Sequence, residues 1–498
     1  MKNLNKRGVS IIAGMAIMLI IAVLTISMVS MLGVTSRQSL DSLRSAQALG
    51  LAQAGLNWYM MQLAGTTNWT TTVNQSNVAL GPGTFDVTLS NKASPQTDST
   101  TATRMDISVT GKVTGTDGVT LQRTMAQRVW KLPSASKFAL FWGRRTGSTL
   151  TLNTSTINGD YWSQGSSTFS GSTITNGKAY RPSTESITGA SSTAIVFPYF
   201  SGFSGATSTF STPSLTTTYY TNLISTYDTA IAGCASGATQ NQNTSIVLAG
   251  NTLCYRNFNT NTNNNTNITI SGNGTIIANR DMTLASTSGT NRTLTIAPSG
   301  GNIVLLAGRS LTVNATAGVN TVTINSGTRM YSASNTSNNQ LLTVNNNNTN
   351  ISGSLLLADR RIVVQNSANI TGSTLFVNYP GDATNNYLRV TGAGTSVGTV
   401  ASPCNLISRG RANSNLASAL TLDTNASITG FLYQYDGANT GSTDISTATV
   451  TGALIANQFM GNTIDSLTLT YNSAVITDPP LEGFNGFATK EPDTWTGS

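Results

Sequence analysis

Residues able to do acid–base, metal or nucleophilic chemistry are scarce in this sequence. It contains no histidine and has three glutamates, Glu185, Glu482 and Glu491. Without histidine, Ser-His-Asp triads and most metal sites are excluded. The densest charged cluster is Asp359–Arg360–Arg361, and Asp160 follows a recurring turn motif. A solvated loop explains both more simply than a cleft that cleaves polysaccharide, which needs paired carboxylates at a set separation. We therefore expect no enzymatic activity, no metal and no cofactor.

The three cysteines are Cys234, Cys254 and Cys404, and none has the CxxC or Cys/His spacing of a zinc site. Cys234 and Cys254 are near enough in the sequence to close a small disulfide loop if the domain is exported. Two small buried thiols explain this pair equally well, and both interpretations stay open. Cys404 indicates nothing by itself.

Composition favours a β-rich protein over a cytoplasmic enzyme. The 498 residues predict two to four domains, only 9% are charged, and the hydrophobic 39% recurs in short alternating runs after about residue 84. The net charge of +8 is scattered, apart from Lys2, Lys6 and Arg7. Nucleic-acid binding needs a concentrated basic face, so no nucleic-acid partner is predicted.

The N-terminus combines a short basic segment with a long apolar one. Residues 1 to 8 read MKNLNKRG, and the run from Val9 to Val34 carries no charge. That run is long enough to span a bilayer, with the basic end cytoplasmic. An ordinary secretory signal has a shorter apolar stretch and a small-x-small cleavage site. A plain transmembrane anchor remains an alternative.

Helical periodicity continues beyond the apolar run. No proline interrupts residues 9 to 63, and Gly65 is a plausible stop. The pattern predicts one helix over residues 9 to 65, about 80 Å long, apolar all round in its first half and amphipathic in its second. Its apolar stripe consists of Leu49, Ala52, Leu56, Tyr59 and Leu63.

These features together resemble the PilX-type minor pilins of type IV pili. The shared features are the basic leader ending in Gly8, the apolar helix directly after it, and the AxAGL pattern at Ala52–Ala54–Gly55–Leu56. The likeness covers the chain from Met1 to about Gly65. It implies that a prepilin peptidase cleaves between Gly8 and Val9 and that the new N-terminus at Val9 is methylated. It also implies contact with other pilins through the helix, residence in the inner membrane before assembly, and then a place on the pilus at the cell surface.

One position departs from the family. Major pilins carry Glu at the fifth mature position, where it meets the N-terminal amine of a neighbouring subunit, whereas this chain has Ala13 there. A carboxylate inside a membrane bundle is expensive without that partner. The departure implies a subunit at the tip of a fibre, or one that initiates it, as in the large minor pseudopilins of type II secretion.

Residues 66 to 133 predict a small antiparallel head packed on the helix. Phe85, Val87 and Leu89 alternate with polar residues, as do the apolar residues between Met105 and Val113. Asp117–Gly118 is a good hairpin turn. Val119, Leu121, Met125 and Val129 continue on one parity in a third strand. Residues 133 to 136 look like a linker.

A loose motif recurs from residue 137 to 485: a β-branched or aromatic residue, then Ser, Thr or Asn, then Gly. The spacings from Ile351 to Ile370 and from Ile428 to Val450 match roughly one turn of a parallel β-solenoid. Short apolar strands follow most copies. The glycines of the motif are Gly159, Gly171, Gly272, Gly353, Gly372, Gly430 and Gly452.

A parallel β-solenoid is the predicted fold of this part, and a conventional β-sandwich is the competing one. The asparagine tracts at 261–267 and 345–350 are either stacked ladders or flexible loops. Residues 213 to 232 break the pattern with Tyr220, Leu223, Tyr227 and Ile231 at helical spacing, which predicts one helix ending before Cys234. Residues 486 to 498 are treated as a tail. The stretch from Ile428 to Pro480 also resembles the β-helical domain attached to PilX-type N-termini.

Two functions remain on this sequence. The first is a structural or adhesive minor subunit of a type IV pilus or related fibre, with a surface glycan or a host surface as a candidate ligand. The second is a membrane-anchored solenoid that binds or cleaves polysaccharide. Thr-x-Thr pairs (Thr149–Thr151, Thr321–Thr323, Thr468–Thr470) suggest an ice-binding or adhesive surface, but threonine is simply a good strand residue. The aromatic residues Tyr161, Trp162, Tyr433 and Tyr435 more often cover a core than stack on sugars.

Overall fold

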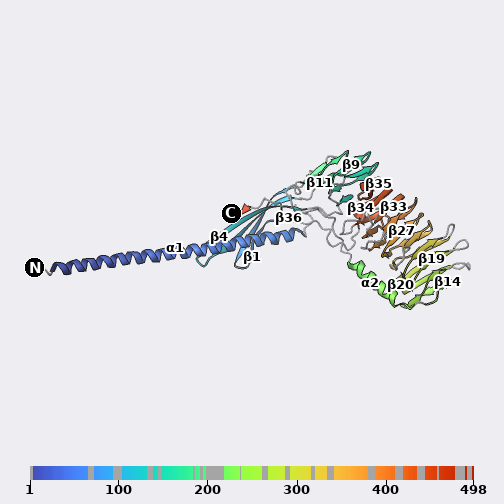
Figure 1. The fold of residues 1–498 in the computed structure, drawn as a ribbon, viewed down its shortest axis with the longest axis horizontal. Coiled ribbons are helices and arrows are strands. Elements are labelled where there is room, and N and C mark those ends of the chain that lie inside the picture. Colours follow the sequence, from blue (N-terminus) through green and yellow to red (C-terminus); the bar gives the residue numbers. More distant parts are fainter. Residues whose placement is uncertain are drawn as a thin grey trace. The chain divides into compact units, whose positions relative to one another are not determined.

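A computed structural model of the chain shows two compact units, Met1–Leu132 with Gly486–Ser498, and Pro133–Asn485 (Figure 1). The predicted features outside the described residues are positions 1–3 of the leader, Gly65, the linker at 133–136, the asparagine tract at 261–266, and Tyr435. The structure describes residues 4–64, 72–93, 104–131, 138–143, 149–182, 185–190, 194–197, 218–235, 237–260, 267–286, 292–315, 320–333, 341–378, 387–409, 419–434, 443–456, 459–476, 488–490 and 496–497.

A single long helix begins the first unit. Helix α1 spans Leu4–Ala64, 61 residues, and is therefore about 90 Å long. It begins at Leu4, earlier than the predicted start at Val9. Within the apolar half, the Thr25 hydroxyl donates to the carbonyl oxygen of Ile21 (2.7 Å), so the helix itself satisfies this polar group. The helix is thus continuous through its apolar and amphipathic halves, as predicted.

The sheet of the first unit is antiparallel, with four consecutive strands in the order β1-β2-β3-β4. Three strands were predicted, and β1 was missed because it has too few apolar residues to show alternation. The predicted turn at Asp117–Gly118 joins β3 to β4, where Gly118 has φ +75° and donates its N–H to the carbonyl oxygen of Gly115 (3.0 Å). The strands are β1 (Gln75–Leu80), β2 (Gly83–Ala93), β3 (Arg104–Thr114) and β4 (Thr120–Lys131).

Small residues allow α1 to lie directly on this sheet. A Cβ at Gly111 would lie 2.1 Å from the carbonyl oxygen of Ala48 and 2.7 Å from the backbone nitrogen of Ala52. The predicted stripe is correct except at Leu49, which is exposed because the helix turns Ala48 and Leu51 to the sheet instead. The core of this contact consists of Ala52, Leu56, Tyr59, Leu63, Phe85, Val87, Met105, Ile107, Val109, Met125 and Val129.

The C-terminal segment belongs to this sheet as well. It supplies β36 (Ala488–Lys490) and β37 (Thr496–Gly497), which both pair antiparallel with β4. Treating residues 486 to 498 as a tail was therefore wrong. Pairing of Ala488 with Lys131 puts the start of β36 beside the end of β4. The second unit is consequently an insertion between two neighbouring strands of the first.

The second unit is a parallel β-solenoid, which excludes the sandwich. The motif copies stack one coil apart as predicted, since Ile351 pairs with Ile370 and Ile428 with Val450, both in parallel register. All seven motif glycines have positive φ, from +53° to +144°. At Gly452 the space is limiting as well, because a Cβ there would lie 1.9 Å from the carbonyl oxygen of Gly430 in the preceding coil. Only glycine fits this stacking.

The solenoid strands are short and follow one another in chain order. Before the helical insert they are β5 (Leu140–Trp142), β6 (Leu150–Asn153), β7 (Thr156–Asn158), β8 (Tyr161–Ser163), β9 (Ser167–Ser170), β10 (Thr173–Thr175), β11 (Ala179–Pro182), β12 (Ile187–Thr188) and β13 (Ala194–Phe197). After it they are β14 (Gln240–Gln242), β15 (Ile246–Val247), β16 (Thr252–Tyr255), β17 (Phe258–Thr260), β18 (Ile268–Ala278), β19 (Met282–Ser286), β20 (Thr293–Ala307), β21 (Leu311–Ala315), β22 (Thr321–Ile324), β23 (Thr328–Ser332), β24 (Leu342–Asn345), β25 (Thr349–Ser352), β26 (Leu355–Ala358), β27 (Arg361–Gln365), β28 (Asn369–Thr371), β29 (Thr374–Val377), β30 (Tyr387–Val390), β31 (Ser396–Val397), β32 (Cys404–Ser408), β33 (Leu420–Gln434), β34 (Thr443–Ala456) and β35 (Thr463–Thr470).

Stacking order differs from chain order. The first coil of the unit stacks on the last one, since Leu140 of β5 pairs with Leu454 of β34 and Thr156 of β7 with Thr468 of β35. Coils β5 to β13 then continue the stack outward. After helix α2 (Thr218–Gly233), β14 begins the opposite end, and the chain winds back toward the first coil (Figure 1). The predicted helix over 213–232 is confirmed as α2 from Thr218 onward, and positions 213–217 lie outside the described residues.

Candidate functional site

The N-terminal half of α1 exposes apolar side chains on all sides. Between Ile11 and Val34 the large hydrophobic side chains that the structure describes are each at least half exposed. This stretch is about 36 Å long, more than the hydrocarbon core of a bilayer. Among the described residues, α1 is the one helix that is long and apolar enough to cross a membrane. Such a surface needs lipid or other helices around it.

The predicted processing residues lie at the start of this surface. Gly8 and Val9 are helical, and Ala13 is exposed. A Cβ on the nearby Gly14 would meet no atom within 4 Å. Cleavage after Gly8, methylation of Val9 and the consequence of Ala13 at the fifth mature position stay predictions.

A polar contact marks where α1 meets the sheet. Arg44 Nη1 donates to both carboxylate oxygens of Asp117, at 3.1 and 2.9 Å, and Asp41 lies 3.8 Å from the same guanidinium. The Arg44 hydrogen bond is the main cause that holds the pKa of Asp117 below its usual value. At the next helix position, the Ser45 hydroxyl accepts a hydrogen bond from Arg123 Nε (2.8 Å). This contact fixes the hairpin tip to the helix, and no sequence pattern indicated it.

The charged residues noted in the sequence lie between solenoid strands or at their ends. Asp359 and Arg360 connect β26 to β27, Arg361 lies over the ring of Tyr387 (5.4 Å to its centroid), and Asp160 accepts the backbone N–H of Lys178 (2.9 Å). The described residues contain no group of three His, Cys, Asp or Glu able to hold a metal ion.

Threonine pairs face different sides of the solenoid. Thr323 and Thr468 belong to one row of outward residues, which runs through their register partners Asn350 and Thr449. Thr151 belongs to another row, beside Thr463 and Thr168. The three predicted pairs therefore do not form one surface. The described aromatics Tyr161, Trp162 and Tyr433 are fully buried and cover the core, as expected.

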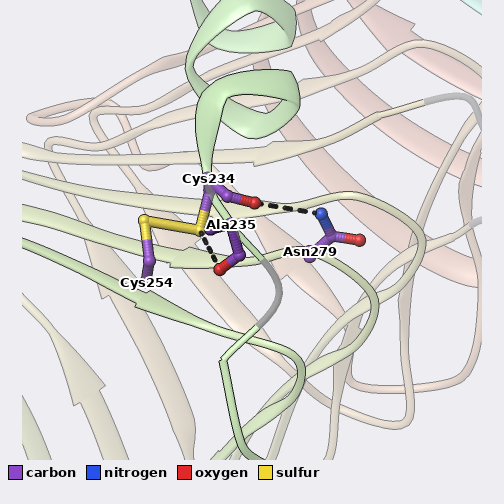
Figure 2. Close-up of a disulfide and its surroundings, with 4 residues drawn as sticks. All are labelled: Cys234, Ala235, Cys254 and Asn279. Carbon is purple, nitrogen blue, oxygen red and sulfur yellow. Dashed lines mark hydrogen bonds between the residues drawn. A yellow bond between two sulfur atoms is a disulfide. The ribbon is translucent and has the colours of Figure 1, made fainter.

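The structure brings two of the three cysteines together. Cys234 follows α2, and Cys254 lies in β16, with their Cα atoms 5.7 Å apart and their sulfurs joined in a disulfide (Figure 2). The side-chain amide of Asn279 donates to the carbonyl oxygen of Cys234 (3.3 Å). Cys404 is a buried thiol in β32 that accepts the backbone N–H of Ser373 (3.4 Å), and burial raises its pKa to about 12. It is therefore unreactive.

Comparison with known proteins gives one solved structure. No family model matches the chain, and no curated protein matches it. A similarity exists to the crystal structure of the competence-associated pilin ComZ from Thermus thermophilus, at 10% identity, over 91% of this chain and 97% of that one, with a TM-score of 0.20. At that TM-score the likeness carries no argument, and the fold described above rests on this chain's own strand pairing and helix packing.

Proposed function

We propose that this chain is a non-enzymatic minor subunit of a type IV pilus or a related pilus-like fibre. The observation that carries the proposal is α1 itself. One uninterrupted helix exposes an uncharged apolar half and docks its other half on an antiparallel sheet through Ala48, Ala52 and Gly111. An apolar half that is inserted in the membrane before assembly can pack against the helices of other pilins afterwards.

Processing by a prepilin peptidase is the sharpest consequence. The intact mass of the purified chain is expected to correspond to a start at methylated Val9. We expect Gly8→Val to leave the full-length chain, because the cleaved bond follows Gly8. Gly14→Ala, a substitution in open space in the same helix, is the matched control and should be processed normally. An intact Met1 in the wild-type chain, or cleavage near Val34, would contradict the proposal.

We further propose a tip or initiating position. Ala13 offers no carboxylate to the amine of a subunit already in the fibre, so this chain does not need a predecessor at that contact. Nanogold labelling of the solenoid should mark fibre ends. Uniform labelling along the shaft would refute this position and leave membership of the fibre intact.

The solenoid is proposed to serve assembly or adhesion. Deletion of the gene should abolish fibre assembly or attachment. Intact fibres with altered glycan turnover would instead favour a membrane-anchored protein that acts on polysaccharide. Binding of the full chain to a glycan array then tests whether the solenoid recognises a surface glycan.

A further inference from the structure

One side of the solenoid is apolar on both its inner and its outer surface. In strands such as β26, neighbouring residues Leu356 and Leu357 are both fully buried although they point to opposite faces. Leu356 belongs to the internal core. The outward residues align coil by coil, are buried at every coil, and form what we call the outer apolar row: Ile277, Leu306, Tyr331, Leu357, Phe376, Ile407, Tyr433, Ile455, Phe141, Trp162 and Tyr180.

Helix α2 covers part of this row. The ring of Tyr220 stacks on Phe376, with centroids 4.6 Å apart, and two helical turns later the ring of Tyr227 lies 5.7 Å from Tyr331. The Tyr331 hydroxyl also donates to a carboxylate oxygen of Asp228 (2.7 Å). The contacts therefore pass from β29 to β23 as the helix advances.

Helix α2 ends at the coil β14–β16, which lies at one end of the solenoid. A Cβ on Gly308, which follows β20, would lie 3.3 Å from a methyl carbon of Ile231, and Cys234 bonds to Cys254 in β16. From β29 to β16 the stack passes five strand spacings, about 24 Å. The residues from 220 to 233 span about 20 Å of helix, and Cys234 follows directly. The close match means that α2 runs along the stack rather than across it.

The coil at that end, β14–β16, is paired on one side. Among the described strands, β14 pairs with β17, and both β15 and β16 pair with β18. These partners all belong to the following coil. Val247 in β15 is exposed, and Leu253 in β16 is only half buried. An end coil held from one side opens more easily than an internal one, because it has half the strand pairing and less buried apolar area.

We propose that α2 is a disulfide-anchored strap, which holds the end coil β14–β16 on the solenoid and releases it when the Cys234–Cys254 bond is reduced. Bond formation takes two electrons and two protons from the two thiols, and a partner disulfide of the thiol–disulfide exchange type accepts them and becomes a dithiol. Reduction by a dithiol reverses the exchange. The strap is independent of the proposed role in a fibre.

Hydrogen exchange read by mass spectrometry on the full chain in detergent tests the strap. Removing the cross-link between Cys234 and Cys254 should raise local opening on the order of 100-fold. The wild-type chain treated with reductant, and the double variant Cys234→Ser with Cys254→Ser, should both exchange faster over residues 218 to 260. Coils beyond β29 should keep their protection. Cys404→Ser, in a distant coil, is the matched control and should leave the exchange of residues 218 to 260 unchanged.

Three results would overturn the strap. One is equal exchange in the oxidised and reduced wild-type chain. The second is a uniform increase over all coils, which would make the disulfide a general stabiliser. The third is rapid labelling of Cys234 and Cys254 as thiols in the purified, unreduced chain. If the double variant does not fold, the reduced wild-type chain still decides.

Discussion

Gly111→Ala tests how closely α1 lies on its sheet. The added Cβ would lie 2.1 Å from the carbonyl oxygen of Ala48. An ordinary contact is 3.4 Å or more, so the helix must retreat by about 1.3 Å. Overpacking against backbone costs about 3 kcal/mol, the upper end of the usual range, because no flexible side chain can yield.

Hydrogen exchange of strand β3 measures this destabilisation, since β3 lies under the helix. A destabilisation of about 3 kcal/mol corresponds to roughly a 150-fold rise in opening, and it should appear as faster exchange of the β3 amides in the full chain. Gly50→Ala is the matched control. Gly50 is also in α1 but has no atom within 4 Å of an added Cβ, so alanine should stabilise the helix by up to about 1 kcal/mol. Equal exchange in Gly111→Ala and the wild-type chain would refute the close packing.

Three further perturbations follow from the same structure. Leu56→Ala removes a side chain buried between α1 and the sheet and should cost about 2–5 kcal/mol, again measured by exchange of β3. The pKa of Asp86 is lowered, first by the backbone N–H of Asn77 and then by Lys112. The stabilisation that ionised Asp86 gives the folded chain is therefore present above the unfolded pKa near 4, and it is lost as pH falls through the folded pKa. Circular dichroism between pH 5 and 2 should show a smaller acid-induced loss of folded structure in Asp86→Asn than in the wild-type chain. Gly452→Ala combines φ +141° with a backbone clash. It should lower the free energy of unfolding of the solenoid by about 3 kcal/mol or more, seen as a lower midpoint of urea unfolding.

Local patterns predicted the elements of this fold well. The run from Val9 to Val34, the spacing of Ala52, Leu56, Tyr59 and Leu63, and the turn at Asp117–Gly118 each depend on a few neighbouring residues, and all three appear in the structure. The recurring glycine motif indicated stacking because Gly must take positive φ where one coil lies on the next.

Long-range partners were beyond such patterns. No pattern among neighbouring residues predicts that Thr156 pairs with Thr468, because this pairing joins the first coil of the solenoid unit to the last one in chain order. The continuous apolar run at Leu355 to Leu357 was available as a signal, since residues buried on both faces of a strand do not alternate. What covers this part of the outer surface, however, is α2, and its position depends on Tyr220 and Phe376 meeting across the fold.

For the asparagine tract at 345–350, the structure supports a ladder. Asn366 donates its side-chain amide to Asn345 (2.7 Å), and Asn369 donates to Asn350 (3.3 Å), each one coil apart. Repeated amides of this kind satisfy one another along the stack. In the other tract, Asn267 accepts the backbone N–H of Thr293 (3.0 Å).

Insertion of the solenoid between β4 and β36 determines how it carries load. A domain appended at a chain terminus is joined to the rest of the protein by one covalent connection. The solenoid has two, which leave the sheet at the paired residues Lys131 and Ala488. Tension on the solenoid is therefore divided between two adjacent strands, and a single proteolytic cut in either connection leaves the solenoid attached through the other.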